Sequence, residues 1–386
     1  MKFKTIDNVS LKGKRVLLRV DINSPLINNK IVDNERIEIA SKTINDLLRK
    51  KASAVILSWQ GRKGDKDFTS LSYHHKFLNK HCNGRVKFVK DVIGRKAINA
   101  IKQLKYGEAL LLDNVRYVNE KSKKLVKKLK PLFDYYVFDG FSVAHRDVNS
   151  VTGFKNMKIL IGREMQYEIK HLNELEKFKR PLTYVLAGKK PDDVIQLIES
   201  KIKDVDYVLT AGVIGELFII ASGHKLGKKE KLFKKLGYFK LIPRLKKLLA
   251  SGKIEYPLDI AVEVNNKRRE LQINGLPIDK MIWDVGEETI KLYSQIIKKS
   301  KTIYLKGTLG NYDDNMIFSK GTKAILNAVI ESKAYSIVGG GNTADAVDRF
   351  INRKRISYFS LSGGALLEYL AGKKLPGLEM LKNANK

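Results

Sequence analysis

The chain has 386 residues, of which 43% are hydrophobic, and its formal net charge is +33. A chain of this length is too long for one ordinary core, so we expect two domains of roughly 200 residues each. The single cysteine, Cys82, excludes an intramolecular disulfide and any zinc site built from cysteines.

Several features predict a cytoplasmic protein. No apolar run reaches the roughly 18 residues of a membrane-spanning helix. The first residues, MKFKTIDNVS, lack the apolar core of a signal peptide, and a lone cysteine fits a reducing compartment. We therefore expect a cytoplasmic protein that does not contact a membrane.

The positive charge predicts attraction to polyanions, which include phosphorylated metabolites, nucleotides and nucleic acids. Charge alone does not choose among these ligands. Much of the excess lies in two lysine-rich runs, 121–130 and 225–235. Such runs usually coat the solvent-facing side of a helix, and we interpret both in this way.

The first strand is predicted at 14–20, where KRVLLRV is an apolar run typical of a strand buried on both faces. Arg19, Asp21 and Asn23 lie at its carboxyl end. Ligands of open α/β sheets bind beyond the carboxyl ends of the strands, so these side chains are candidates for a site. An ordinary Asp/Asn turn before Pro25 explains the same residues equally well.

Arginines recur at equivalent places in the first half. A helix capped by Asp33 or Asn34 carries Arg36 in its first turn. Strands predicted at 54–58, 109–112 and 135–138 are followed by Arg62, Arg116 and Arg146.

One arginine after a strand is usually a surface residue, but four such arginines converge on one rim. Guanidinium groups suit phosphate and carboxylate, so the rim predicts a pocket for a small ligand with several negative charges. We interpret His145, beside Arg146, as a structural residue.

An amphipathic helix is predicted at 162–180, between the two halves. Its apolar residues recur at helical spacing along one stripe: Met165, Ile169, Leu172, Leu175 and Phe178. Pro181 ends the helix, because a proline disfavours helical backbone in the residue before it. We interpret this helix as the joint between two lobes.

Glycine-rich turns follow the strands of the second half, which are predicted at 182–186, 206–210, 302–305 and 335–338. The turns contain Gly188, Gly212, Gly307 and Gly339-Gly340-Gly341, and a last one, Gly363-Gly364, opens another helix. A strand, a glycine turn and a helix N-terminus form a general layout for binding phosphate. Close packing of helix against sheet is the alternative explanation for these glycines.

Both halves are therefore predicted to be α/β domains with doubly wound parallel, Rossmann-like sheets. We assign residues 1–160 to the first domain, 161–180 to a hinge helix, 181–360 to the second domain and 361–386 to a C-terminal segment.

Several stretches together resemble phosphoglycerate kinase, and most closely its archaeal branch. They occur in the family's order: Arg19–Pro25, Asp113–Arg116, Ala144–Ser150, Gly339–Thr343, and Gly363–Leu370 with Leu375–Gly377. The resemblance implies a two-lobed, hinge-bending kinase of glycolysis. With Mg²⁺ it would transfer a phosphoryl group reversibly between 1,3-bisphosphoglycerate and ADP, giving 3-phosphoglycerate and ATP.

The resemblance also implies roles for individual residues. The glycerate substrate would bind to Asp21, Asn23, Arg36, Trp59, Arg62, Arg116 and Arg146. The nucleotide would bind to Lys190, Ala211, Gly212, Asp313, Gly340, Gly341, Asn342 and Thr343. Arg36, Lys190 and the backbone of Gly363 and Gly364 would act on the moving phosphoryl group, and the segment 361–386 would return toward the first domain.

The sequence departs from the family pattern mainly on the nucleotide side. Trp59 replaces a usual histidine, whereas Lys189, Lys306, Asp313 and Asn342 all depart from the usual nucleotide-binding residues. An amide at 342 removes a charge near the metal, so we expect no metal site made by the protein and a Mg²⁺ ion held mainly by the nucleotide phosphates. The nucleotide preference stays open.

A second hypothesis is a weakly active relative that binds nucleic acid or another polyanion through its charge. It would explain the net charge of +33 and the altered nucleotide turns. Against it, the arginines are ordered site by site, whereas a nucleic-acid surface needs only diffuse charge. We therefore favour the kinase.

Overall fold

The computed structural model describes residues 1–28, 30–188 and 190–384. The chain divides into two compact units. The first comprises Met1–Glu174 with the C-terminal segment from Lys374 onward, and the second comprises Leu175–Lys373. None of the helices in the described ranges combines the length and the apolar character needed to cross a membrane.

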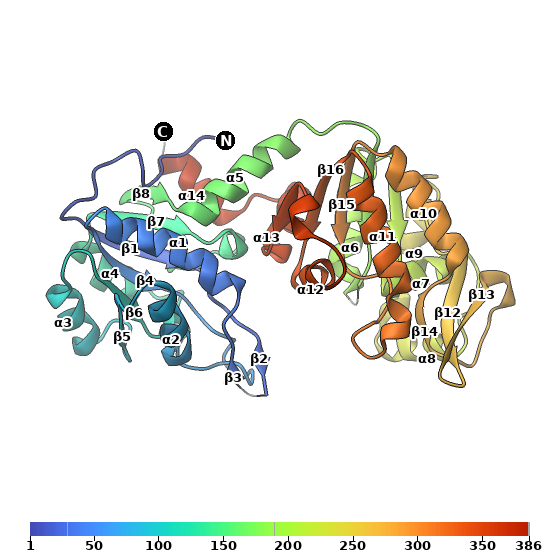
Figure 1. Ribbon diagram of the computed structural model, residues 1–386, viewed down its shortest axis with the longest axis horizontal. Helices are drawn as coiled ribbons and strands as arrows, with labels where there is room; N and C mark the ends of the chain where they lie inside the picture. Colours follow the sequence, from blue (N-terminus) through green and yellow to red (C-terminus); the bar gives the residue numbers. More distant parts are fainter. Residues whose placement is uncertain (29, 189, 385–386) are drawn as a thin grey trace. The chain divides into compact units, whose positions relative to one another are not determined.

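A six-stranded parallel sheet forms the centre of the first unit, in the order β5-β6-β4-β1-β7-β8 (Figure 1). Its strands are β1 (Arg15–Val20), β4 (Ser53–Leu57), β5 (Val86–Val89), β6 (Ala109–Leu112), β7 (Tyr135–Asp139) and β8 (Lys158–Ile161). A two-stranded hairpin, β2 (Leu26–Ile27) and β3 (Lys30–Ile31), follows β1. The central strands are almost wholly buried, as their continuous apolar runs predict.

Helices connect these strands, and short 3₁₀ helices follow two of them. The helices are α1 (Glu35–Arg49), α2 (Ser72–His81), α3 (Arg95–Gln103), α4 (Lys124–Leu129), α5 (Arg163–Leu175) and α14 (Pro376–Ala384). The 3₁₀ helices are η1 (Val115–Tyr117), η2 (Lys130–Leu132) and η3 (Phe141–Val143). The Asn34 side chain caps α1 by accepting a hydrogen bond from the backbone N–H of Arg36, which fixes Arg36 in the first turn.

The second unit contains another six-stranded parallel sheet, in the order β11-β10-β9-β15-β16-β17 (Figure 1). Its strands are β9 (Leu182–Leu186), β10 (Tyr207–Thr210), β11 (Ile254–Glu255), β15 (Thr302–Lys306), β16 (Tyr335–Gly339) and β17 (Tyr358–Ser360). Two parallel α/β sheets confirm the predicted fold class.

The α-helices of the second unit are α6 (Pro191–Lys201), α7 (Gly212–Ala221), α8 (Lys228–Lys235), α9 (Ile242–Leu249), α10 (Glu287–Lys299), α11 (Lys320–Glu331), α12 (Gly341–Phe350) and α13 (Gly363–Leu370). Its 3₁₀ helices are η4 (Tyr238–Leu241), η5 (Ile273–Gly275), η6 (Met316–Ser319) and η7 (Arg353–Arg355). A three-stranded antiparallel sheet, β13-β12-β14, is added to this α/β framework. It consists of β12 (Asp259–Val264), β13 (Lys267–Gln272) and β14 (Ile282–Val285), and the sequence did not predict it.

The helix expected at 162–180 is shorter in the structure, because α5 ends at Leu175. Met165, Ile169 and Leu172 are buried as the apolar stripe requires. Phe178, the last member of the predicted stripe, is 41% exposed and so lacks the packing that would extend the helix.

The division between the units falls inside α5, at Glu174/Leu175, within the segment 161–180 that we assigned to the hinge. Residues 361–373 belong to the second unit, where α13 contacts α6. The return to the first unit therefore begins at Lys374 rather than at 361, and α14 packs against β8 there.

Three glycine turns of the second unit pack directly on one another at the carboxyl ends of β9, β10 and β15. Gly188, Gly212 and Gly307 all have positive φ, at 105°, 57° and 88°. A Cβ added to Gly212 would lie 3.1 Å from the backbone nitrogen of Gly188, and one added to Gly307 would lie 2.1 Å from the carbonyl oxygen of Ala187. Only glycine allows this approach of backbone to backbone.

We predict that Gly307→Ala lowers the free energy of unfolding by about 3 kcal/mol, because it combines positive-φ strain with a backbone clash. The matched control is Gly372→Ala, since Gly372 has a similar φ of 79° but no atom within 4 Å of the added Cβ. This control should lose only about 1 kcal/mol. Urea denaturation of both variants measures the difference, and equal losses would show that the clash is relieved at no cost.

Candidate functional site

In the first unit, Asp21 fixes Arg36 at the carboxyl edge of the sheet. The Asp21 carboxylate accepts hydrogen bonds from the Arg36 guanidinium, from the Ser142 hydroxyl and, at 3.1 Å, from the backbone N–H of Asn23. Burial alone would raise the pKa of Asp21, but Arg36, Ser142, Arg19 and the backbone N–H of Asn23 together outweigh burial, so the pKa is lowered. Asp21 therefore stays ionised and holds the guanidinium beside the end of β1.

Trp59, just after β4, lies between two guanidinium groups. The guanidinium carbons of Arg19 and Arg116 are 4.3 and 4.0 Å from the centre of the indole ring. Arg19 is fully buried and donates to the backbone carbonyl of Leu57 at 3.3 Å. Trp59 is itself only 5% exposed. The indole can thus position both arginines through cation–π attraction, while it offers little surface to a ligand.

Arg62 and Arg146 lie close enough to Arg116 to act on its charge. Burial lowers the pKa of Arg116, Glu120 opposes this shift, and the charges of Arg62 and Arg146 add to it. Arg62 and Arg146 are exposed. Three positive groups near one another repel, and a bound anion would relieve that repulsion.

Buried polar contacts hold the loop that follows Trp59. The Gln60 side chain donates to the backbone carbonyl of Ser24 at 2.9 Å and accepts from the Ser24 N–H at 2.8 Å. The backbone of Gly61 donates to the Asn23 side chain at 3.0 Å and accepts from the Arg116 guanidinium. These contacts join Asn23 and Arg116 through a single residue. The candidate glycerate residues therefore form one connected surface, which we name the arginine rim: Asp21, Asn23, Arg36, Trp59, Arg62, Arg116 and Arg146.

In the second unit, the turns after β16 and β17 lie side by side. Gly340 has a φ of 108°, and a Cβ added to Gly363 would lie 2.9 Å from the Gly340 Cα. The Thr343 hydroxyl accepts from the backbone N–H of Gly307 at 2.8 Å and donates to the Gly339 carbonyl at 3.2 Å. Thr343 thus connects these turns to the three glycine turns described above. The helices α6, α7, α12 and α13 all begin at this edge of the sheet.

Two lysines stand at the same edge. Lys190 is exposed at the N-terminus of α6, and Lys306 ends β15. Burial lowers the pKa of Lys306, Asp193 opposes the shift, and the nearby Lys190 adds to it. Two cations held close together beside helix N-termini suit a phosphate group. Lys189 lies outside the described residues, and so does the side chain of Asn342, which belongs to α12 with Gly341.

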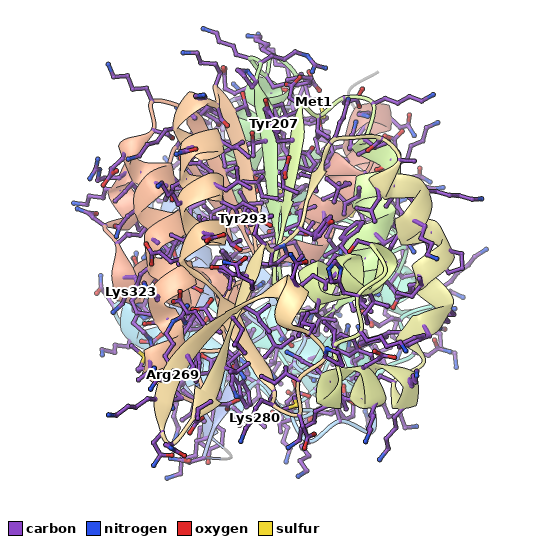
Figure 2. All side chains as sticks on the ribbon, turned by 90° about the vertical axis from the view of Figure 1, so that its right-hand side faces the viewer. Met1, Tyr207, Arg269, Lys280, Tyr293 and Lys323 are labelled. Carbon is purple, nitrogen blue, oxygen red and sulfur yellow. The ribbon has the colours of Figure 1, made fainter. Side chains whose placement is uncertain are left out.

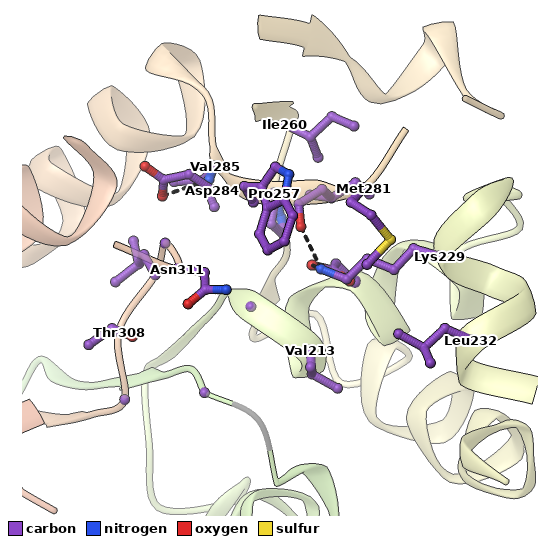
Figure 3. A pocket seen from close by; sticks show the side chains of 18 of the residues that line it. Val213, Lys229, Leu232, Pro257, Ile260, Met281, Asp284, Val285, Thr308 and Asn311 are labelled. Atoms are coloured by element: carbon purple, nitrogen blue, oxygen red, sulfur yellow. Dashed lines mark hydrogen bonds and ion pairs between the residues drawn. The ribbon is translucent and has the colours of Figure 1, made fainter. Parts of the chain in front are cut away.

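A cavity of about 360 Å³ opens beside the glycine turns (Figure 3). Gly188, Gly212 and Gly307 line it, together with Asp313, which is exposed. Figure 3 shows Lys229 and Met281 on one side of the cavity and Thr308 and Asn311 on another. Among the described residues predicted for the nucleotide, Gly212 and Asp313 thus line the cavity, whereas Lys190, Ala211, Gly340 and Thr343 lie at the neighbouring turns.

Sequence reasoning missed most of the cavity wall. Its apolar part comes from α8 and from the antiparallel sheet and the chain before it: Leu232, Phe233, Pro257, Ile260, Met281 and Trp283. Its charged residues include Asp284 of β14, and Glu216 of α7 with Lys229 of α8, whose ammonium is 2.6 Å from a Glu216 oxygen. Lys229 lies in the lysine-rich run 225–235, whose side chains we expected to be exposed to solvent. Phe233, four residues later and 1% exposed, marks the buried face of α8 and was the signal that could have singled out Lys229.

The other lysines of the two runs, 121–130 and 225–235, are exposed or partly exposed, as that interpretation predicts. Figure 2 shows long side chains with nitrogen tips pointing outward from the ribbon, with Lys280 and Lys323 among them. The positive charge is therefore spread over the surface of many elements.

The described residues contain no group of three or more His, Cys, Asp or Glu side chains that could hold a metal ion. Asp193 and Asp313 offer single carboxylates near the glycine turns. Mg²⁺ usually keeps several waters and binds through phosphates with one or two carboxylates. This donor set fits a Mg²⁺ ion that arrives with the nucleotide.

Comparisons with known proteins agree with this geometry. A family model for phosphoglycerate kinase matches residues 6–373. The phosphoglycerate kinase of Saccharolobus solfataricus is 40% identical over 396 residues, which cover 98% of this chain and 96% of that protein. The phosphoglycerate kinase of Methanothermus fervidus is 36% identical over 404 residues, which cover 100% of this chain and 98% of that protein.

Comparison with solved structures identifies the same family. The crystal structure of phosphoglycerate kinase from Pyrococcus horikoshii matches with a TM-score of 0.92 and 31% identity, covering 99% of both chains. The phosphoglycerate kinase structure from Coxiella burnetii matches with a TM-score of 0.84 and 31% identity, covering 100% of both. Nothing in these comparisons supports the alternative of a nucleic-acid-binding protein, and the resemblance seen in the sequence motifs is confirmed. The chain belongs to the phosphoglycerate kinase family.

Proposed function

We propose that the arginine rim of the first unit binds the glycerate substrate and that the glycine turns of the second unit bind the nucleotide. The reaction is that of the family, a reversible Mg²⁺-dependent phosphoryl transfer between 1,3-bisphosphoglycerate and ADP that gives 3-phosphoglycerate and ATP. The observation that supports the proposal is that each unit gathers one kind of group suited to anions at the carboxyl edge of its parallel sheet. One surface is made of guanidinium groups, and the other is made of backbone and helix N-termini.

On the arginine rim, Arg116, Arg62 and Arg146 would hold the phosphate and carboxylate of the three-carbon substrate. Burial is the main cause that lowers the pKa of Arg116, and the charges of Arg62 and Arg146 lower it further; this repulsion supports the role because an anion removes it. Asp21 would keep Arg36 oriented through their ion pair. Trp59 would hold Arg116 in place through its ring face.

On the nucleotide side, backbone N–H groups at the N-termini of α6, α7 and α12 would bind the phosphates. Lys190 and Lys306 would add positive charge at this point. The cavity lined by Gly212 and Asp313 would take the nucleoside. A bound Mg²⁺ ion would neutralise part of the phosphate charge.

Phosphoryl transfer needs positioning and charge stabilisation more than a side-chain nucleophile. Arg36 and Lys190 would each neutralise oxygens of the moving group, and the first amides of α13, at Gly363 and Gly364, would donate to them. Both ligands must meet at one phosphoryl group. We therefore propose that the units close on each other about the segment 161–180, which excludes water during transfer.

We also propose that the chain acts as a monomer in the cytoplasm, where the reaction is a step of glycolysis. A monomer is supported by the fact that this one chain supplies both anion-binding surfaces. The cytoplasm is supported by the single cysteine, Cys82, which is buried and unpaired.

A coupled assay tests the activity directly. The purified chain should form ATP from ADP and 1,3-bisphosphoglycerate, and chelation of Mg²⁺ should abolish turnover, because the metal offsets phosphate charge. Failure to form ATP at any Mg²⁺ concentration, in a chain folded by circular dichroism, would overturn the proposed function.

Substitution of either proposed catalytic cation should lower kcat by about 100-fold, since each would remove a charge aimed at the transition state. The variants are Arg36→Ala and Lys190→Ala. Matched controls are Arg49→Ala, at the other end of α1, and Lys203→Ala, just beyond α6. The controls should keep kcat within about 2-fold. If Arg36→Ala and Lys190→Ala behave like the controls, these two residues have no part in the transfer.

Replacement of Trp59 should affect the glycerate substrate alone. In Trp59→Ala, Arg19 and Arg116 lose their contacts with the ring, and the KM for 3-phosphoglycerate should rise about 10-fold. Trp59→Phe keeps an aromatic face and should recover most of this loss. The KM for the nucleotide, measured in the same assay, is the internal control. A rise in both KM values would mean that the substitution acts on the fold rather than on the arginines.

A further inference from the structure

The charged pair in the cavity wall differs from an ordinary structural ion pair. Glu216 is 4% exposed, and the Lys229 side chain is 13% exposed. The Lys229 ammonium donates to one Glu216 oxygen and to the backbone carbonyl of Ile282, both at 2.6 Å. An ammonium group has three hydrogens, so these two bonds leave one for a ligand.

Two side-chain acceptor atoms of cavity-lining residues are buried and lack a hydrogen-bond partner among the described residues. They are the second carboxylate oxygen of Glu216 and the side-chain oxygen of Asn311. Burial raises the pKa of Glu216, in spite of the opposing charge and hydrogen bond of Lys229. A buried acceptor that lacks a donor costs free energy. A ligand with N–H donors would remove this cost.

We propose that Glu216 and Lys229 read the hydrogen-bonding edge of the nucleotide base and favour guanine over adenine. This inference rests on the proposed role of the cavity in nucleotide binding. The apolar side chains of the wall, among them Pro257 and Met281, would pack on the faces of the base. Apolar packing holds any purine in the same way, whereas hydrogen bonds to a carboxylate distinguish one purine from another.

The choice of guanine follows from the balance of donors and acceptors. Guanine presents the acceptor O6 beside two donors, N1–H and the 2-amino group. Lys229 can donate to O6 while the unpartnered Glu216 oxygen accepts from N1–H and the 2-amino group. Adenine presents one donor, the 6-amino group, beside the acceptor N1. It can make two such contacts, whereas guanine can make three.

The same geometry argues against a purely structural pair. A buried ion pair is stabilising only when additional hydrogen bonds satisfy its remaining lone pairs and protons. Here one carboxylate oxygen lacks such a bond while the pair borders open space. The site is therefore complete only when a donor occupies the cavity.

A series of nucleoside diphosphates tests the proposal on the unmodified chain. ADP, GDP, IDP and purine riboside diphosphate differ only at the edge of the base. We expect kcat/KM and the Kd from calorimetry to favour GDP over ADP by about 10-fold, with IDP close to ADP because, without the 2-amino group, it also makes two contacts. Purine riboside diphosphate, which has no group at position 6, should be the weakest.

Glu216→Gln should reduce the preference for GDP over ADP to about 2-fold, because the amide replaces a charged acceptor and adds N–H groups that oppose N1–H. The control is Glu199→Gln, which breaks the exposed ion pair to Arg244 in the last turn of α6. This control should keep the preference of the unmodified chain. The ligand series above does not depend on the folding of either variant.

The outcomes separate this inference from the proposed function. Equal kcat/KM and equal Kd for all four diphosphates, or a preference for ADP, would overturn base reading while leaving the kinase intact. Discrimination in Kd without phosphorylation of any diphosphate would support base reading and overturn the proposed kinase role of the cavity. A preference for GDP that persists unchanged in folded Glu216→Gln would remove Glu216 from the readout.

Discussion

Parallel pairing is the constraint on which the candidate surface of each unit depends. In each six-stranded sheet, every strand delivers its carboxyl end to the same edge. In the first sheet, the residues that follow the strands carry guanidinium groups and form the arginine rim. In the second, they are glycines, so backbone from β9, β10 and β15 meets at van der Waals distance. One architecture therefore supplies two kinds of surface suited to anions, according to the residues placed after the strands.

Electrostatic repulsion is built into both surfaces. Burial lowers the pKa of both Arg116 and Lys306, and neighbouring cations add to each shift: Arg62 and Arg146 for Arg116, and Lys190 for Lys306. Such clusters cost free energy in the absence of a ligand and are kept in place by other contacts. The ring of Trp59 fulfils this role on the arginine rim. Like charges are thus held close together at the places where the proposed ligands carry the opposite charge. The lysine runs on the outer surface instead affect solubility and the rate at which anionic ligands meet the protein.

Much of this could be predicted from sequence, because continuous apolar runs and strand-end residues are local signals. The strands β6 and β9 lie at their predicted bounds. The antiparallel sheet was missed because β13, with the sequence KRRELQ, is mostly exposed and looks like a polar loop. Lys229 was missed because its neighbours are solvated lysines. What makes it different is burial against Glu216, a residue from another helix. The spacing to Phe233 marks the buried face of α8, but no local pattern identifies the partner.

The cavity wall and the glycine turns come from different parts of the second unit. The turns belong to the parallel sheet, whereas Met281, Ile282 and Trp283 border or belong to β14, in the antiparallel addition. In the proposed arrangement, substitutions in that addition would alter which nucleobase is accepted without disturbing the backbone assigned to the phosphates. Base selection and phosphate binding would then be free to change independently of each other.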